Sequence, residues 1–145
     1  MRGRRLFDAS SIFAAIRSER PELLFGEYTL DLARYELTNA VWKECCLRNL
    51  LSPEAAERLL GIIVRAVDRM EALGLKGLEA DALRFARDLR LTAYDASYVA
   101  ASMRHGLVLV TEDERLRRAA SAVVESVGLR ELIGGQGPRD RHTGT

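Results

Sequence analysis

Two aspartates stand where an apolar stretch of the sequence gives way to a helical pattern. Asp8 follows the apolar pair at residues 6–7, and Asp113 follows the continuous, β-branched stretch at residues 107–111. In open α/β sheets ligands bind at the carboxyl ends of the strands, and both aspartates are expected at that edge. Carboxylate oxygens suit hard metal ions such as Mg²⁺ or Mn²⁺. Both positions are therefore candidates for metal chemistry.

Two further acids lie on predicted helices. Asp95 opens a helix after Leu91-Thr-Ala-Tyr, and Glu36 lies within a helix, with Asn39 three residues further on. Each of the four acids also has an ordinary structural interpretation. An aspartate at a helix start is more often an N-cap than a catalyst, and a glutamate within a helix is more often a solvated surface residue. Taken one by one, these residues do not decide between chemistry and structure.

The elements that must position these acids alternate along the chain. Strands are predicted at residues 6–7, 25–30 and 107–111, with 123–124 as a last candidate. Helices are predicted from Asp8 to Pro21, at about 31–50, from Pro53, at about 79–89 and at about 95–104. Strands separated by helices indicate βαβ units and a parallel sheet.

Two helix boundaries carry strong local signals. Ser52 is expected to be an N-cap because Pro53 occupies the first helical position after it. By its pattern alone this helix continues to Leu73. Gly106 is expected to cap the helix that precedes the strand at 107–111.

The length of 145 residues fits one domain. Residues 134–145 contain Gly, Pro and polar residues without periodicity, and are expected to form a flexible tail after a domain at 1–133. Lys plus Arg total 22 against 21 for Asp plus Glu, which gives a net charge of +1. This balance argues against a protein that coats nucleic acid by charge alone, but permits an enzyme that touches a few phosphates.

The cysteines and the hydropathy indicate the compartment. Cys45 and Cys46 are adjacent and form neither a disulfide framework nor a zinc motif, which favours a reducing compartment. No stretch approaches the roughly 18 apolar residues of a membrane span, and the N-terminus has no signal-peptide core. We therefore expect a cytoplasmic protein that does not enter the membrane.

Four short segments, taken in order, resemble the PIN domain. They are Phe-Asp8-Ala-Ser10, Glu36-Leu-Thr-Asn39-Ala-Val-Trp-Lys43, Tyr94-Asp95-Ala-Ser-Tyr98 and Leu-Val-Thr111-Glu-Asp113. The resemblance covers residues 6–127 and is strongest to the VapC-type ribonuclease toxins of bacterial and archaeal toxin–antitoxin pairs. The Tyr-Asp-Ala-x-Tyr and Thr-x-Asp segments are the most specific.

This resemblance implies a fold and an activity. The fold is a three-layer α/β/α sandwich with a central, mostly parallel sheet, and the activity is metal-dependent endoribonuclease. The family's acidic positions, catalytic and metal-binding, correspond to Asp8, Glu36, Asp95 and Asp113. The positions that support these carboxylates correspond to Ser10, Asn39 and Thr111. The family also has a middle strand near residues 67–75, where the pattern alone predicts a helix.

Four carboxylates in one pocket cannot all stay ionised without compensation. Two charges about 4 Å apart repel by roughly 4 kcal/mol at an effective dielectric of about 20, so protons or cations must neutralise them. Mg²⁺ or Mn²⁺ is expected, because zinc normally recruits His or Cys. Hydrolysis by a metal-activated water is the expected mechanism, with Asp8 and Asp95 as the main ligands. Whether Asp113 binds a second ion, and whether Glu36 is a ligand or orients the water, stays open.

Contacts to RNA are expected from side chains near the acids. The candidates for phosphate contacts are Arg2, Arg4, Arg5, Arg115, Arg117 and Arg118. For any one of them a solvated surface position is the commoner arrangement. Tyr94 and Tyr98 are candidates for base stacking, although Tyr98 is expected more often to pack into a helix interface. Glu112 is expected to point away from the pocket.

Partners follow from the resemblance, and alternatives stay open. Toxin-like PIN domains commonly dimerise and bind a small antitoxin over the active site, so a homodimer and a cognate antitoxin are expected. An RNA-processing nuclease outside a toxin pair and a non-catalytic PIN scaffold for RNA or protein are the alternatives. A phosphohydrolase is disfavoured because it requires Asp-x-Asp where this chain has Asp8-Ala-Ser10. A receiver domain is disfavoured because it requires a lysine after a late strand.

Overall fold

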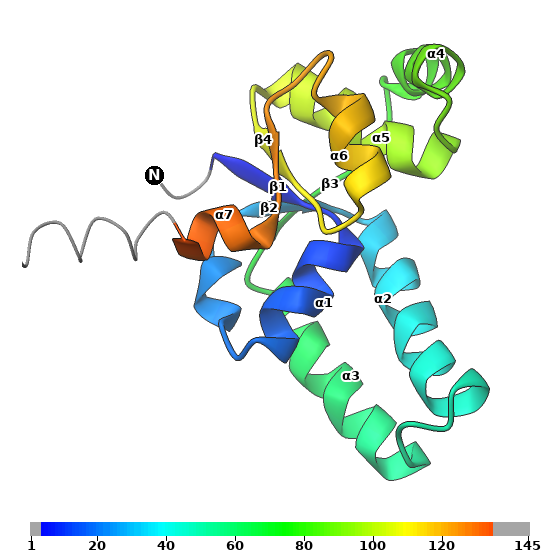
Figure 1. Ribbon diagram of the computed structural model, residues 1–145, viewed down its shortest axis with the longest axis vertical. Helices are drawn as coiled ribbons and strands as arrows, with labels where there is room; N and C mark the ends of the chain where they lie inside the picture. Colours follow the sequence, from blue (N-terminus) through cyan, green and yellow to red (C-terminus); the bar gives the residue numbers. More distant parts are fainter. Residues whose placement is uncertain (1–3, 135–145) are drawn as a thin grey trace, which may run out of the picture.

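The computed structural model describes residues 4–134 (Figure 1). The strands are β1 Arg5–Phe7, β2 Tyr28–Leu30, β3 Glu71–Leu73, β4 Val108–Val110 and β5 Ser126–Val127. The α-helices are α1 Ala9–Arg17, α2 Leu32–Trp42, α3 Pro53–Val67, α4 Glu79–Leu89, α5 Ala93–His105, α6 Glu114–Ala120 and α7 Leu129–Gly134. A 3₁₀ turn, η1, spans Pro21–Leu23, and a π-helix, η2, spans Lys43–Leu47. Residues 135–145, most of the predicted tail, lie outside the described residues.

The five strands are parallel and lie in the order β3-β2-β1-β4-β5. β1 and β4 are central neighbours, with Leu6 opposite Leu109 and Phe7 opposite Val110. The chain adds β2 and β3 on one side of β1 and then β4 and β5 on the other. The strand order therefore reverses between β1 and β4, and the crevice at the carboxyl ends of such a pair is where open sheets bind ligands.

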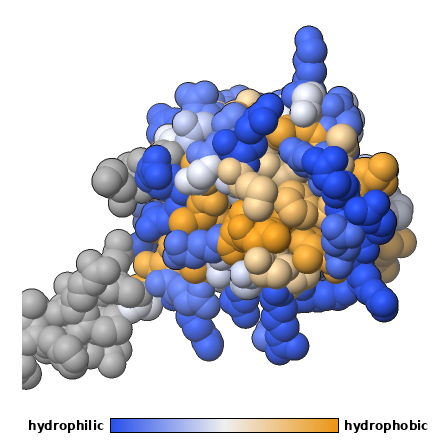
Figure 2. Space-filling view, turned by 90° about the horizontal axis from the view of Figure 1, so that it is seen from above, coloured by the Kyte–Doolittle hydropathy of each residue, from blue (hydrophilic) through white to orange (hydrophobic). Residues whose placement is uncertain are grey.

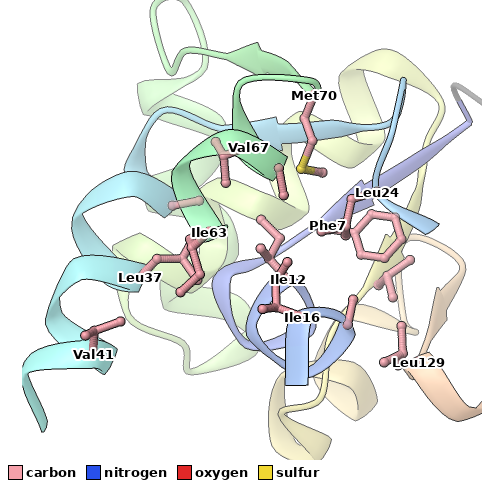
Figure 3. Packing of buried hydrophobic residues seen from close by; sticks show 14 of the residues in the cluster. Phe7, Ile12, Ile16, Leu24, Leu37, Val41, Ile63, Val67, Met70 and Leu129 are labelled. Carbon is pink, nitrogen blue, oxygen red and sulfur yellow. The ribbon is translucent and has the colours of Figure 1, made fainter. Parts of the chain in front are cut away.

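Helices cover both faces of the sheet, which confirms the three-layer α/β/α arrangement (Figure 1). Successive residues of a strand point to opposite faces, so Phe7 and Val110 belong to one core cluster and Leu6 and Leu109 to the other. Figure 3 shows the first cluster, in which Phe7 lies with residues of three helices, Ile12 of α1, Leu37 of α2 and Ile63 of α3.

The prediction that the third long helix continues to residue 73 is wrong. α3 ends at Val67, and Glu71–Leu73 forms β3 at the edge of the sheet, as the family resemblance implied. The first two residues of β3 are exposed, so the segment has no apolar alternation. The pairing with β2 defines the strand, and it begins where the backbone N–H of Glu71 donates to the carbonyl of Glu27 at 2.8 Å. Such a strand depends on its neighbour more than on its own composition.

Two other strand predictions are displaced. The strand predicted from residue 25 begins at Tyr28, because Gly26 has a φ of 77° and turns the chain before it. The last strand is Ser126–Val127 and not residues 123–124, whose backbone N–H groups both donate to the carbonyl of Ala120 at the end of α6.

Local start and stop signals agree with the structure. Ser52 caps α3 by accepting a hydrogen bond from the backbone N–H of Ala55 at 3.1 Å, and Gly106 ends α5 with a φ of 64°. Cys45 and Cys46 are free thiols on η2. Among residues 4–134, no helix has the length and apolar character needed to cross a bilayer.

Candidate active site at the carboxyl edge of the sheet

Asp8 lies directly after β1 and is buried. Its backbone N–H donates to the carbonyl of Val110 at 3.1 Å, which extends the pairing of β1 with β4 by one residue. Its Oδ1 accepts a hydrogen bond from the backbone N–H of Ser11 at 2.9 Å and so caps α1. The N-cap interpretation of Asp8 is therefore right, and the cap also fixes the carboxylate at the switch point of the sheet.

Two hydroxyl groups hold the Asp8 carboxylate from the sides. The Ser10 hydroxyl donates to Oδ1 at 2.7 Å, and the Thr111 hydroxyl donates to Oδ2 at 2.5 Å. Each hydroxyl also accepts a backbone N–H, from Glu112 to Ser10 at 2.9 Å and from Asp113 to Thr111 at 3.0 Å. This network joins the loop after β1 to the loop after β4. The predicted supporting positions Ser10 and Thr111 thus lie in contact with Asp8.

Replacing Thr111 with valine is expected to lower the free energy of unfolding by about 1–3 kcal/mol. The substitution keeps the shape of the buried side chain but removes the donor to Asp8 and the acceptor for the backbone N–H of Asp113. Urea denaturation measures the loss. The control is Thr38→Val, which removes an exposed hydroxyl on α2 and should change stability by less than about 0.5 kcal/mol. Equal losses in both variants would contradict a special role for Thr111.

Glu36 reaches the same site from the middle of α2. Its side chain is half-buried, and the hydroxyl of Tyr98 on α5 donates to its Oε1 at 2.7 Å. Tyr98 is buried, so the expected packing of this ring into the helix interface is confirmed. The hydrogen bond to Glu36 was not foreseen, although Tyr98 stands one helical turn after Asp95 and so shares its face of α5. Asn39 is exposed and makes no side-chain hydrogen bond within the described residues.

Asp95 and Asp113 complete the group from α5 and α6. The cap of α5 is Thr92, whose hydroxyl accepts from the backbone N–H of Asp95 at 3.1 Å. The N-cap interpretation of Asp95 is therefore wrong, and its half-buried carboxylate makes no hydrogen bond within residues 4–134. Asp113 is an N-cap, because its Oδ1 accepts from the backbone N–H of Leu116 at 3.1 Å.

The electrostatics couple Asp8, Glu36 and Asp95 to one another, and Asp113 to Asp95. Burial raises the pKa of the Asp8 carboxyl above its ordinary value, and the hydrogen bonds of its neighbours only partly oppose this. Burial also raises the pKa of Glu36, where the Tyr98 hydrogen bond acts in the opposite direction and the charges of Asp8 and Asp95 add to the rise. The pKa of Asp95 is raised by burial and then by the charges of Asp113 and Asp8. Since such coupling weakens with distance, Asp8, Glu36 and Asp95 lie near one another, and Asp113 lies near Asp95.

The donor set fits a hard divalent cation without forming a ready-made cage. Within residues 4–134, no three His, Cys, Asp or Glu side chains lie close enough together to hold an ion as they stand. Mg²⁺ does not require this, because it usually keeps several waters and binds one or two carboxylates directly. His105 ends α5 while Asp95 lies in its first turn, a separation of roughly 15 Å along the helix axis. The site therefore offers oxygen ligands, which suit Mg²⁺ or Mn²⁺ better than zinc.

Three of the six predicted RNA-binding arginines form ion pairs with other side chains. Arg5 pairs with the buried Glu27 at the amino end of β1, the end opposite to Asp8. Glu114 forms ion pairs with the side chains of Arg117 and Arg118.

Arg115 is the predicted arginine that lies nearest the acids. Its side chain donates to the carbonyl of Arg90 at 2.8 Å, and its charge lowers the pKa of Asp95. Exposed Tyr94 stays available for stacking. Glu112 is turned away as expected, because its Oε2 accepts from the backbone N–H of Leu129 at 3.0 Å. Arg2 lies outside the described residues.

Comparison with known proteins agrees with this geometry. The PIN domain profile matches residues 5–122, a range that contains all four acids. Ribonuclease VapC3 from Pyrobaculum aerophilum is 33% identical over 125 residues, which cover 81% of this chain and 95% of that protein. Exonuclease VapC9 from the same organism is 33% identical over 122 residues, covering 83% of this chain and 88% of that protein.

A solved structure shows the same architecture. The crystal structure of PAE2754 from Pyrobaculum aerophilum matches with a TM-score of 0.73 and 29% sequence identity, over 93% of this chain and 90% of that one. The profile match and the two relatives both extend over most of the chain. The chain therefore belongs to the PIN domain family and resembles its VapC-like members.

Proposed function

We propose that this chain is a metal-dependent endoribonuclease that hydrolyses phosphodiester bonds of RNA. The observation that carries the proposal is the convergence of four carboxylates at the switch point between β1 and β4. Burial raises the pKa of Asp8, Glu36 and Asp95, and repulsion from neighbouring carboxylates adds to the rise at Glu36 and Asp95, so the fold maintains a group of acids at an electrostatic cost. A divalent cation removes this cost. The names of the relatives, a ribonuclease and an exonuclease, support nuclease chemistry.

The carboxylates differ in how firmly they are held, and this suggests their roles. Asp8 is the most rigid ligand, because its two oxygens accept hydrogen bonds from Ser10, Ser11 and Thr111. Asp95 offers both oxygens, since its side chain has no hydrogen bond within residues 4–134. A bound Mg²⁺ or Mn²⁺ would supply Lewis acidity, which acidifies the attacking water and neutralises charge on the scissile phosphate.

Glu36 and Asp113 each keep one oxygen for the reaction. Tyr98 occupies Oε1 of Glu36, so Oε2 is the atom that would bind a metal or accept a proton from the attacking water. The raised pKa of Glu36 brings it nearer to neutral pH, which suits a group that exchanges protons. Asp113 uses Oδ1 to cap α6 and keeps Oδ2 for a second metal or for a water-mediated contact.

A toxin with a cognate antitoxin is the biological setting that we favour. The relatives that carry the VapC name support this setting, and an RNA-processing nuclease outside such a pair is the alternative. We also propose a homodimer. α4 and α5 carry exposed Leu83 and Met103, and Figure 2 shows an apolar area on the upper face of the molecule as drawn in Figure 1. The cytoplasmic location stays a prediction.

Incubation of the purified protein with single-stranded RNA tests the proposed activity. Cleavage is expected with Mg²⁺ or Mn²⁺ and none with EDTA, and adding excess Mg²⁺ to the EDTA sample should restore it. Because one relative is named an exonuclease, a circular RNA without ends is the second substrate. Cleavage of the circle would support an endonuclease. Activity on linear RNA alone would favour an exonuclease, and equal activity in EDTA would contradict the metal-dependent mechanism.

A further inference from the structure

A groove of about 380 Å³ runs from the acid site along the junction of α1 with the end of α2. Ser10 lines its inner end, and the hydroxyl of this residue donates to Oδ1 of Asp8 at 2.7 Å. Phe13 of α1 lines it further along, facing Lys43 and Arg48 at the two ends of η2. The groove therefore adjoins the acid site through Ser10 and extends from there between α1 and the end of α2.

The accessible charge of this groove is positive. Lys43 is exposed and forms no ion pair within the described residues, and Arg48 is 64% exposed. The one acid that lines the groove is Glu44, which is buried and pairs with Arg17 at 2.8 Å. Arg48 lies 3.9 Å from the other oxygen of Glu44. The buried Glu44 carboxylate thus lies between two arginines, of which Arg48 lines the groove.

The π-helix places the two exposed cations on one wall. The backbone N–H of Arg48 donates to the carbonyl of Lys43 at 2.9 Å, which closes a turn that is one residue wider than an α-helical turn. A π-helical turn is uncommon and is found frequently at functional sites. Here it brings two cationic residues into successive turns, both lining the groove.

An aromatic ring completes the groove. Phe13 is half-buried, and the guanidinium carbon of Arg17 lies 4.9 Å from the centre of its ring. A ring held in this way on α1 offers a flat apolar surface next to the cations. Cations beside an aromatic surface form the arrangement by which proteins bind single-stranded nucleic acid, with contacts to phosphates and stacking on bases.

We propose that this groove binds single-stranded RNA on one side of the scissile bond, with Lys43 and Arg48 at phosphates and Phe13 against a base. The inference rests on the proposed function. It extends that function by naming residues that bind the substrate outside the carboxylate group. An acidic peptide could also bind the two cations, but its carboxylates would not stack on the Phe13 ring. The effect of replacing Phe13 therefore distinguishes RNA from an acidic peptide.

Fluorescence anisotropy with a labelled RNA of about 12 nucleotides tests the groove, in EDTA so that the RNA stays intact. The double variant Lys43→Gln/Arg48→Gln is expected to weaken binding about tenfold. It should also lower the slope of log Kd against log salt by about 1.4, the value for two phosphate contacts to a single strand. Phe13→Leu should weaken binding about fivefold or more and leave the salt slope unchanged.

The matched control is Arg84→Gln/Arg104→Gln, which removes two exposed cations, one on α4 and one in the last turn of α5. This control should bind RNA as the natural chain does. Circular dichroism establishes whether each variant is folded. If the double variant is not folded, the single variant Arg48→Gln takes its place in the binding experiment.

Three outcomes would overturn the proposal in different ways. If the natural chain cleaves RNA and the groove variants bind RNA as tightly as it does, the RNA-binding role of the groove is wrong and the nuclease function stands. Failure of the natural chain both to bind and to cleave RNA would overturn the nuclease function and the groove with it. The double variant could also lose affinity for a labelled polyglutamate and for RNA to the same extent. If Phe13→Leu then changed the affinity for neither ligand, the groove would be assigned to an acidic peptide.

Discussion

Replacing Asp8 with asparagine is expected to reduce RNA cleavage in Mg²⁺ by roughly 100- to 10,000-fold, the range typical of groups that handle charge or protons at a reacting centre. The amide oxygen can still accept the hydrogen bonds of Ser10 and the backbone N–H of Ser11, so α1 keeps its cap. The amide NH2 group takes the place of Oδ2 and cannot accept from the Thr111 hydroxyl, which must turn its proton toward the Ser10 hydroxyl 3.3 Å away. The larger loss is a buried negative charge at the switch point of the sheet. Initial rates on a fluorogenic RNA measure the effect.

The same substitution should not destabilise the metal-free protein near neutral pH. Burial raises the pKa of Asp8, so its ionised form is the unfavourable one in the fold, and a neutral amide removes that cost. A lower rate together with an unchanged or higher Tm is therefore expected. A fall in Tm that parallels the loss of activity would mean that Asp8 acts through the fold and not through chemistry.

Asp95→Asn and Glu114→Gln provide the comparison for Asp8. The carboxylate of Asp95 has no hydrogen bond within residues 4–134, so its replacement should remove activity by a similar factor without loss of stability. Glu114 lies on α6 next to Asp113, and its charge pairs with two exposed arginines. Glu114→Gln should leave cleavage within about twofold of the natural rate. If all three variants lose cleavage activity to the same extent, the activity cannot be assigned to Asp8 and Asp95 in particular.

Mg²⁺ or Mn²⁺ is expected to raise the Tm of the natural chain strongly at neutral pH and little near pH 4. The pKa values of Asp8, Glu36 and Asp95 are raised above ordinary values of 3.8, 4.5 and 3.8. The fold therefore favours the protonated acids. Their contribution to stability is present below the ordinary values and is lost as pH rises through the raised ones. Above the raised pKa values the three acids are ionised and a bound cation stabilises them. Below the ordinary pKa values protons compete with the cation for the carboxylates.

Differential scanning fluorimetry between about pH 4 and pH 8, in EDTA and in Mg²⁺, measures this effect. At a metal concentration 100 times the Kd, binding to the folded state alone adds about 2.7 kcal/mol to the free energy of unfolding. In Asp8→Asn/Asp95→Asn the metal-dependent rise should disappear, and in EDTA the variant should gain stability over the natural chain as pH increases. If metal raises the Tm of the double variant as much as that of the natural chain, the cation binds at another site.

The sequence by itself determined the family and named the candidate acids, because both depend on short segments in a fixed order. The chain belongs to the PIN domain family, and Asp8 and Asp113 cap helices after β1 and β4, as their positions indicated. Start and stop signals such as Ser52 and Gly106 were equally readable. Each of these features is encoded within one or two turns of chain, so pattern and spacing are sufficient to find it.

Only the tertiary structure decided the features that depend on residues far apart in the sequence. β3 is a strand because it pairs with β2, and its exposed residues give no local signal. Glu36 was the weakest of the four acids by spacing alone. The hydroxyl of Tyr98, 62 residues away, holds it at 2.7 Å, and the charges of Asp8 and Asp95 act on it. The groove likewise needs α1 beside the end of α2, where η2 places Lys43 and Arg48 together. A hydrogen bond or a groove wall formed across such distances depends on packing, and the local sequence does not record it.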